Sequence, residues 1–371
     1  MEQNWKIIDR NMAISEVKEP EKLKWFDPRK EPFKIFGFYW LKENKNYWRL
    51  PETEFDILLD AAPGVYFMAK DSAGGQIAFE TDAERIVVRA EVETPQRWDH
   101  MPATCEMGMD CYVAYPGEDY MFDGVTRIDA HKNSYTCQLV TDPGRELKRV
   151  IINMPLYMPL LKVEIGLPDD AYIGPSNPFE HEKPIVIYGT SITQGGCVSR
   201  PGVLITNVLS RRLKTEFINL GFSGSGKGEP EVADIVSSII DPEMFILDYE
   251  ANALERIYEN MLPLVEKIRK NNPVTPIIIQ SRVFGYSVRR DRERFQKFLN
   301  RREFQKKLVE DLKAAGDEHI YFSDGLDLME NNNGDCYVDK IHPNDYGAAQ
   351  IANGMERMIK EVRRLEAEKS K

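Results

Sequence analysis

The sequence predicts an all-β sandwich or jelly roll followed by a doubly wound parallel α/β domain. Short runs rich in β-branched and aromatic residues, separated by turn residues, fill the first half. A stretch rich in Pro, Gly and Asn follows at 167–184, which is typical of a linker. Five short apolar runs then alternate with helical patterns. We therefore expect a β domain over residues 1–177 and an α/β domain over 178–371.

The strands expected in the first half are short and bounded by Gly, Pro and Asp. The clearest examples are 64–70, 86–93, 111–115 and 135–140. Helical signals in this half are weak.

The second half has a different pattern. The expected strands are 185–188, 217–220, 245–249, 277–280 and 320–322. The expected helices between and after them are 203–213, 231–240, 254–270, 302–315 and 346–366. Such alternation predicts a parallel sheet that is covered on both faces, with its functional site in the loops at the carboxyl ends of the strands.

The composition limits the partners. Among 371 residues, 49 Lys and Arg oppose 60 Asp and Glu, so the net charge is −11. An acidic chain is not attracted as a whole to phosphate backbones, and we expect no nucleic-acid partner. No apolar run approaches the roughly 20 residues of a membrane span, so no membrane partner is expected. Residues 1–9 lack the features of a signal peptide and predict a cytoplasmic protein, although a trimmed secreted or periplasmic protein would look the same.

The five cysteines are spread along the chain without a C-x-x-C motif, which is typical of reduced thiols rather than of a disulfide scaffold. No His, Cys or carboxylate cluster shows metal-ligand spacing. We therefore expect neither a metal nor another cofactor.

Ser191 is the first candidate for chemistry. It follows the strand expected at 185–188, and glycines on both sides allow the chain to turn sharply. The G-x-S-x-G elbow is not met, because Thr193 occupies the last position. The alternative for such a Ser is to cap the next helix.

A nucleophilic Ser needs a base, and the base needs a partner that orients it. His342 precedes the last expected helix, and Pro343 keeps it out of helical conformation. Asp339, three residues earlier, can reach back to the imidazole and fix its tautomer. The alternative is that Asp339 is a surface charge and His342 a residue at the helix entrance.

Two further strand ends offer hydrogen-bond donors. Gly224 follows the second expected strand and could present a backbone N–H to an oxyanion. Asn252 follows the third and could present its side-chain amide. Asn252 could instead cap the helix expected from Leu254.

These residues resemble the four sequence blocks of the SGNH (GDSL-type) hydrolase superfamily. The blocks are GTSIT with Ser191, GFSGSG with Gly224, DYEAN with Asn252 and DKIHP with Asp339 and His342. The first half resembles the β-sandwich domain of one branch of these esterases, whose G-x-D-L-Y motif appears as GMDCY at 108–112. The blocks G-T-S and D-Y-E-A-N depart from G-D-S and G-x-N-D in the wider superfamily but are similar to that two-domain branch.

The resemblance implies a flavodoxin-like sheet and a serine esterase. It implies Ser191 as nucleophile, His342 as general base and Asp339 as its orienting partner. The N–H groups of Ser191 and Gly224 and the amide of Asn252 would form the oxyanion hole. The implied reaction is hydrolysis of small acyl esters, above all acetyl esters on carbohydrate, through an acyl-enzyme. A lipase or thioesterase for longer acyl chains is the alternative.

Two other classes of function remain open. The loop 221–228 reads G-x-x-x-x-G-K-G, one residue short of a nucleotide-binding P-loop, but Gly228 cannot supply the hydroxyl that binds Mg²⁺. A carbohydrate-binding protein without catalysis would use exposed Trp residues in the first half. The candidates are Trp25, Trp40, Trp48 and Trp98. The basic run 289–308 is interpreted as a solvated helix face, with a basic lid or a contact for an anionic substrate as the alternative.

Overall fold

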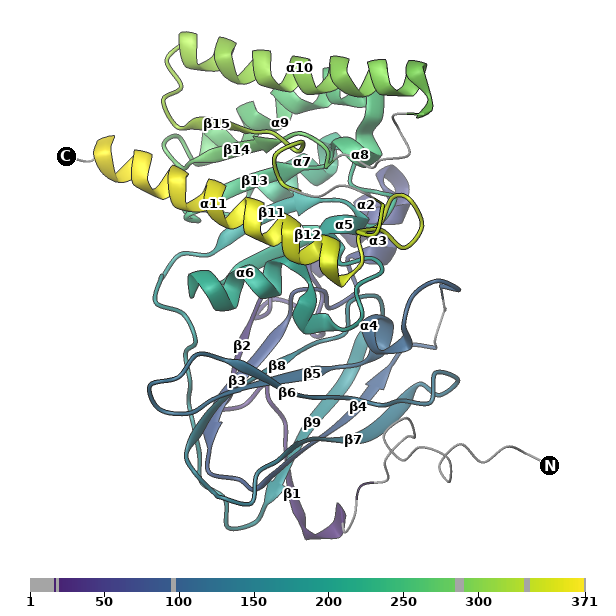
Figure 1. Cartoon of the computed structure of the whole chain (residues 1–371), viewed down its shortest axis with the longest axis vertical. Helices are drawn as coiled ribbons and strands as arrows, with labels where there is room; N and C mark the ends of the chain where they lie inside the picture. The colour runs from purple at the N-terminus through teal and green to yellow at the C-terminus, as the bar shows by residue number, and fades with distance from the viewer. Residues whose placement is uncertain (1–16, 18–19, 95–97, 284–289, 330–333, 370–371) are drawn as a thin grey trace.

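The computed structural model describes residues 17, 20–94, 98–283, 290–329 and 334–369. A β-sandwich forms one end of the molecule, and a parallel sheet covered by helices forms the other (Figure 1). The predicted fold class is thus confirmed.

Two antiparallel sheets make the sandwich. The first has the order β1-β9-β4-β7 and the second β10-β3-β8-β5-β6, with β2 beside β3. The strands are β1 (Leu23–Phe26), β2 (Lys34–Phe36), β3 (Gln76–Thr81), β4 (Arg85–Val92), β5 (Asp110–Ala114), β6 (Met121–Val125), β7 (Ser134–Thr141), β8 (Lys148–Asn153), β9 (Leu160–Pro168) and β10 (Ile173–Gly174). Alternate residues such as Ile77 and Phe79 on β3 and Ile86 and Val88 on β4 fill the core between the sheets, as the period of two along a strand requires.

The second sheet is parallel and has the order β12-β11-β13-β14-β15. Its strands are β11 (Ile185–Gly189), β12 (Phe217–Gly221), β13 (Met244–Asp248), β14 (Ile277–Gln280) and β15 (Ile320–Ser323). In sequence order this is 2-1-3-4-5, the flavodoxin-like arrangement. The chain reverses its winding direction after β12, so the loops that follow the paired strands β11 and β13 lead to opposite sides of the sheet. Ligands bind at such a switch point in folds of this kind.

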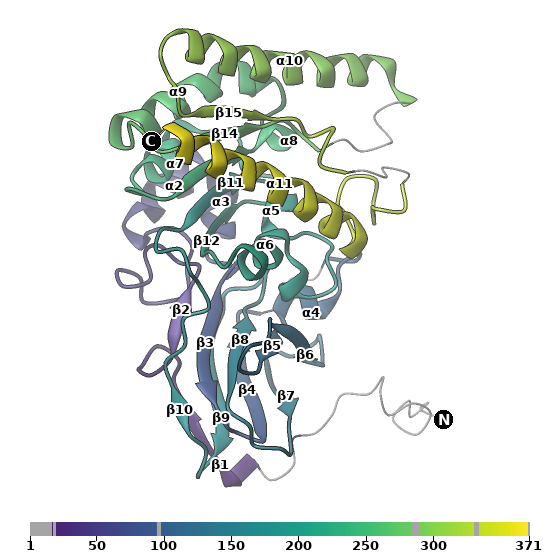
Figure 2. The ribbon, with the colours of Figure 1, turned by 60° about the vertical axis from the view of Figure 1, so that its left-hand side comes forward.

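Helices cover both faces of this sheet, which is why its strands are continuously apolar (Figure 2). The helices are α5 (Ser191–Gln194), α6 (Ile205–Leu213), α7 (Pro230–Ser237), α8 (Glu250–Ala253), α9 (Ile257–Asn271), α10 (Arg292–Ala314) and α11 (Asp345–Lys369), with one-turn 3₁₀ helices η4 (Pro201–Val203) and η5 (Leu254–Arg256). Ile185 and Ile187 face the core under α6 and α11, and Val186 and Tyr188 face the core under α7 and α9. No helix within the described ranges combines the length and the apolar character needed to cross a membrane.

The strand expected at 64–70 is wrong. This segment forms α3 (Pro63–Met68), which follows η3 (Glu52–Glu54) and α2 (Phe55–Ala61). Leu58 of α2 and Val65 of α3 are fully buried. Ala62, which separates the two helices with a non-helical backbone, and Ala69, which follows α3, are also buried. They pack in the same core as Val186 and Tyr188 of the parallel sheet. A segment of the first half therefore covers the sheet of the second.

The basic run is also more than a solvated face. Arg301 on α10 is 4 % exposed, and its guanidinium forms ion pairs with Glu250 and Glu255 at 3.0 and 3.1 Å. Arg302 pairs with Asp324. Residue 289 lies outside the described residues. These two arginines thus anchor α10 to the loops after β13 and β15.

Asp110, the acidic residue of GMDCY, joins the two halves. Its buried carboxylate lies 2.5 Å from the Arg200 guanidinium and accepts the Gly202 N–H at 2.8 Å. The Asn153 amide donates to its other oxygen at 2.8 Å. Burial raises the pKa of Asp110 above its usual value, although these partners oppose the shift. The contact ties β5 of the sandwich to the segment that leads from α5 into α6.

Candidate active site

Ser191 is the first residue of α5 and lies at the carboxyl end of β11, where the fold predicts a site. Its side chain is held in a confined position, with 7 % of the residue exposed. The helix is one turn long and ends at Gly195, whose φ of +103° is a left-handed conformation that favours glycine. As the first helical residue, Ser191 has a backbone N–H with no carbonyl partner inside the helix. Ser191 thus presents both a hydroxyl and an N–H at this edge.

Three side chains form a hydrogen-bonded chain from this hydroxyl. His342 Nε2 lies 2.8 Å from Ser191 Oγ, and His342 Nδ1 lies 2.6 Å from Asp339 Oδ2. Asp339 Oδ1 accepts the backbone N–H groups of His342 at 2.7 Å and Ile341 at 3.0 Å. Partial burial raises the pKa of Asp339, but the hydrogen bonds outweigh burial and the net pKa lies below its usual value. Asp339 is therefore an anion positioned to hold a proton on His342 Nδ1 and leave Nε2 facing Ser191.

The glycine loop after β12 uses most of its backbone N–H groups internally. Phe222 O accepts from Ser225 and Gly226 at 3.0 Å each. Lys227 N–H donates to Glu229, and Gly228 N–H donates to the Tyr188 hydroxyl at 2.9 Å. No such partner holds the Gly224 N–H within the described residues. Gly224 has a φ of +66°, and nothing lies within 4 Å of where a Cβ would stand.

The partners of these N–H groups argue against the nucleotide-binding alternative. A P-loop cradles phosphate with a series of outward-pointing N–H groups. Here the N–H groups of Lys227 and Gly228 point back into the protein. The geometry leaves one loop donor, Gly224, where a phosphate cradle needs several.

Asn252 lies in α8 after β13, and its side-chain amide donates to Phe222 O at 3.2 Å. The structure therefore places this amide against the loop that carries Gly224. Asn252 does not cap the following helix η5, because Ala253 occupies its N-cap position and no side chain bonds there.

A buried polar network from the first half supports the glycine loop. Gln194 Oε1 accepts the Ser223 N–H at 2.8 Å, and Gln194 Nε2 donates to Asp71 at 2.8 Å. The fully buried Arg49 guanidinium bonds the carbonyl oxygen of Gly221 and lies over the Phe222 ring at 4.8 Å. Burial raises the pKa of Asp71 to about 7, against the effect of Arg49 and Gln194. No local pattern in the sequence indicates this network, because Arg49 and Asp71 lie more than 100 residues from Gln194 and the glycine loop.

A second carboxyl, which is partly buried, lies beside α5. Asp248 ends β13, and its carboxylate accepts the Thr193 hydroxyl at 3.0 Å. Burial raises the pKa of Asp248 to about 7.

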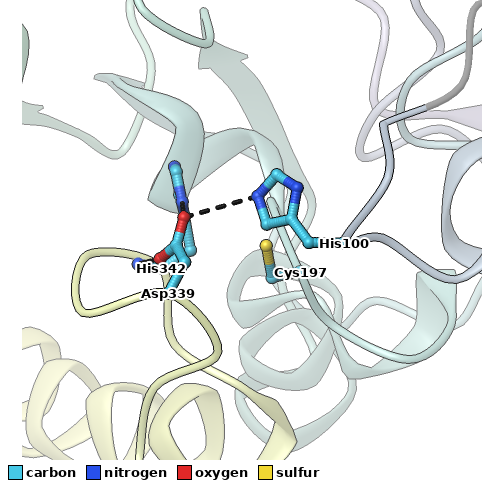
Figure 3. Close-up of side chains that lie close together, drawn as sticks. All are labelled: His100, Cys197, Asp339 and His342. Atoms are coloured by element: carbon cyan, nitrogen blue, oxygen red, sulfur yellow. Dashed lines mark hydrogen bonds and ion pairs between the residues drawn. The ribbon is translucent and has the colours of Figure 1, made fainter.

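The sandwich half also reaches the site, and the sequence did not reveal which residues do so. Tyr157 donates from its hydroxyl to Ser191 O at 3.4 Å, and its ring meets Trp98 edge to face at 6.5 Å. Trp98 is 44 % exposed, whereas Trp40 is buried. His100 Nε2 lies 3.4 Å from Asp339 Oδ2, with Cys197 close by (Figure 3). Burial raises the pKa of Cys197 to about 12, so in the free protein it is a thiol.

Comparison with known proteins agrees with this architecture. Residues 182–360 match the profile of the GDSL-like Lipase/Acylhydrolase family. Residues 23–173 match the profile described as the N-terminus of SGNH hydrolase-type esterases. Residues 182–360 thus form a GDSL-like acylhydrolase domain. No curated protein matches this acylhydrolase significantly.

Solved structures similar to this acylhydrolase share both halves. A putative GDSL-like lipase from Bacteroides ovatus ATCC 8483 is 28 % identical with a TM-score of 0.84, over 92 % of this chain and 98 % of that one. The salicylyl-acyltransferase SsfX3 of a tetracycline biosynthetic pathway is 19 % identical with a TM-score of 0.75, over 94 % and 98 %. An acetyl xylan esterase from Butyrivibrio proteoclasticus is 12 % identical with a TM-score of 0.57, over 92 % and 100 %. The last two likenesses concern the fold alone.

Proposed function

We propose that this acylhydrolase is a serine esterase that removes small acyl groups, chiefly acetyl, from O-acetylated carbohydrate. The observation that carries the proposal is the hydrogen-bonded chain Asp339–His342–Ser191, with links of 2.6 and 2.8 Å. Ser191 Oγ attacks the ester carbonyl while His342 Nε2 takes its proton. His342 then protonates the leaving alkoxide, and water hydrolyses the acyl-enzyme by the reverse proton route.

The oxyanion formed in each step needs preorganised donors. Ser191 N–H, Gly224 N–H and the Asn252 amide are the proposed set. Ser191 is the first residue of a helix, which supports its N–H as a donor. The neighbouring N–H groups of the glycine loop are hydrogen-bonded, whereas the Gly224 N–H has no such partner among the described residues. The contact between Asn252 and Phe222 O holds the third donor beside the loop.

Carbohydrate as the alcohol is supported by Trp98. It is exposed at the rim of the site and stacks edge to face with Tyr157, and flat aromatic rings suit the apolar faces of sugars. Family 2 carbohydrate esterases and an acetyl xylan esterase share the fold.

Longer acyl chains remain the second candidate, because apolar side chains flank the proposed catalytic groups. Val338 and Ile341 lie on the His342 loop with 46 % and 48 % exposure, and Leu254 follows Asn252 with 42 %. These side chains could cover an alkyl chain.

One experiment separates the two candidates. Acetate release is measured from acetylated xylo- and cello-oligosaccharides, and rates on p-nitrophenyl esters are measured from acetyl to decanoyl. We expect acetate release and a kcat/KM that falls with chain length. A kcat/KM that rises beyond butyryl, with no acetate release, would move the assignment to a lipase or thioesterase.

A further inference from the structure

Four potential metal ligands meet beside Ser191, although they come from three distant segments. They are His100 of the sandwich half, Cys197 after α5, and Asp339 and His342 before α11. One ligand atom from each lies within 4.8 Å of the others. Figure 3 shows the His100 ring, the Cys197 sulfur and the Asp339 carboxylate turned toward a common space.

His100 lies between two carboxylates. Its Nδ1 lies 3.1 Å from Asp99 Oδ1, and its Nε2 lies 3.4 Å from Asp339 Oδ2. When the ring is neutral with its proton on Nδ1, Nε2 offers a lone pair beside the Asp339 carboxylate, and a cation can be shared between the two. The Asp99–His100 pair is also the carboxylate–histidine arrangement that commonly supports a metal ligand.

The types of ligand favour one class of ion. Imidazole nitrogen, thiolate sulfur and a carboxylate oxygen together suit Zn²⁺, which prefers four ligands in a tetrahedron. Bonds of roughly 2.0–2.3 Å place such ligand atoms about 3.3–3.8 Å apart. The most distant pair of ligand atoms must therefore approach by about 1.5 Å at most from the present 4.8 Å, and the exposed His100 side chain can rotate toward the other ligands.

We propose that this cluster, His100–Cys197–Asp339–His342, is a reversible Zn²⁺ site that switches the enzyme off. Cys197 releases its proton to solvent when the ion binds, because the thiolate is the ligand. Whichever ring nitrogen of His342 takes the ion, the ion displaces the hydrogen bond to Asp339 or the one to Ser191. The inhibitory effect rests on the proposed function, whereas binding itself does not.

Cobalt binding to the full chain tests the site without any assay of activity. The EDTA-treated protein is titrated with CoCl₂, and the thiolate-to-cobalt charge-transfer band and the tetrahedral d–d bands are recorded. We expect one Co²⁺ per chain, loss of the charge-transfer band in Cys197→Ser, and at least ~10-fold weaker binding in His100→Ala. Cys137→Ser, in the buried sandwich core, and His131→Ala, on the exposed sandwich surface, are matched controls that should bind like the parent.

Zinc inhibition is then measured with p-nitrophenyl acetate. We expect inhibition that EDTA reverses, and half-inhibition of His100→Ala at a Zn²⁺ concentration at least ~10-fold higher. A charge-transfer band that survives Cys197→Ser, unchanged affinity in His100→Ala, or binding without inhibition overturns the proposal. A normal cobalt spectrum with no esterase activity would instead refute the proposed function and leave the metal site standing.

Discussion

Gln194 Oε1 accepts the backbone N–H of Ser223 at 2.8 Å, and this bond ties the helix that begins at Ser191 to the loop that carries Gly224. Two of the three proposed oxyanion donors, the N–H groups of Ser191 and Gly224, therefore come from segments that one buried side chain joins. The other end of the same amide reaches Asp71, so the first half of the chain supports the geometry of the second.

Gln194→Ala should impair turnover more than binding. The change leaves the Ser223 N–H and the Asp71 carboxyl without this partner, which costs about 1–3 kcal/mol of stability. A loop displaced by about 1 Å should lower kcat by ~10²-fold with little change in KM. Steady-state kinetics and thermal unfolding check this, with Gln296→Ala on the exposed side of α10 as the control. Unchanged kcat would mean that the loop holds its position without Gln194.

Asn252→Ala should remove one oxyanion donor. We expect kcat to fall by ~10²–10³-fold while KM changes little, because the interaction strengthens only in the transition state. Kinetics on p-nitrophenyl acetate measure the split between kcat and KM.

Gly224→Ala is the matched control for the Asn252 experiment. It keeps the backbone N–H, and an added Cβ meets no atom within 4 Å. Because Gly224 has a φ of +66°, an alanine there should lower the stability by about 1 kcal/mol. We expect a smaller loss of kcat in Gly224→Ala than in Asn252→Ala. A greater loss in Gly224→Ala would argue against Asn252 as a donor.

The free energy of unfolding should fall as pH rises from the ordinary pKa of Asp248, 3.8, to its raised pKa of about 7. Its pKa is raised to about 7 in the folded chain, above the ordinary value of 3.8, so the folded state holds a proton that the unfolded state releases. The stabilisation is complete below pH 3.8 and lost as pH rises to about 7. Asp248→Asn should remove a change in the free energy of unfolding on the order of 4 kcal/mol between pH 4 and 8. A slope from Asp71, whose pKa is also raised to about 7, should remain. Denaturant unfolding at several pH values checks it, and an unchanged slope would contradict the assignment.

The domain boundary between residues 177 and 178 stays a prediction. The packing of α2 and α3 against the parallel sheet offers a test of it. Leu58 and Val65 in these helices are fully buried in the core that includes Val186 and Tyr188. An expressed fragment 178–371 lacks this cover, so we expect it to unfold at least 10 °C below the full chain or to aggregate. A fragment that unfolds cooperatively at the parent temperature would show that the helices contribute little.

The sequence was informative where structure depends on local pattern. Uniformly apolar runs such as 185–188 identified the strands of the parallel sheet, because both faces of each strand are buried. The strand expected at 64–70 is wrong because Val65 and Tyr66 favour strands, whereas Pro63 begins a short helix there, a position that suits proline. Ser191, Asp339 and His342 each follow a strand or precede a helix, so parallel topology predicted their convergence.

The remaining parts of the site depend on contacts that no local pattern encodes. Arg49 contacts the glycine loop at Gly221 O, and Asp71 contacts Gln194, and both contacts join residues more than 100 positions apart. The His100–Cys197–Asp339–His342 cluster likewise has no ligand spacing in the sequence, because only Asp339 and His342 are neighbours along the chain. Metal-motif reasoning looks for local spacing and therefore predicted no site here.

Covalent labelling of the full chain with an alkyl fluorophosphonate, followed by peptide mass spectrometry and an esterase assay, tests most directly whether Ser191 is the nucleophile. We expect one adduct per chain, on Ser191, with loss of activity in proportion to labelling. We also expect that Ser191→Ala is neither labelled nor active, with unchanged circular dichroism. An adduct on another residue, or full esterase activity in a folded Ser191→Ala protein, would contradict this role.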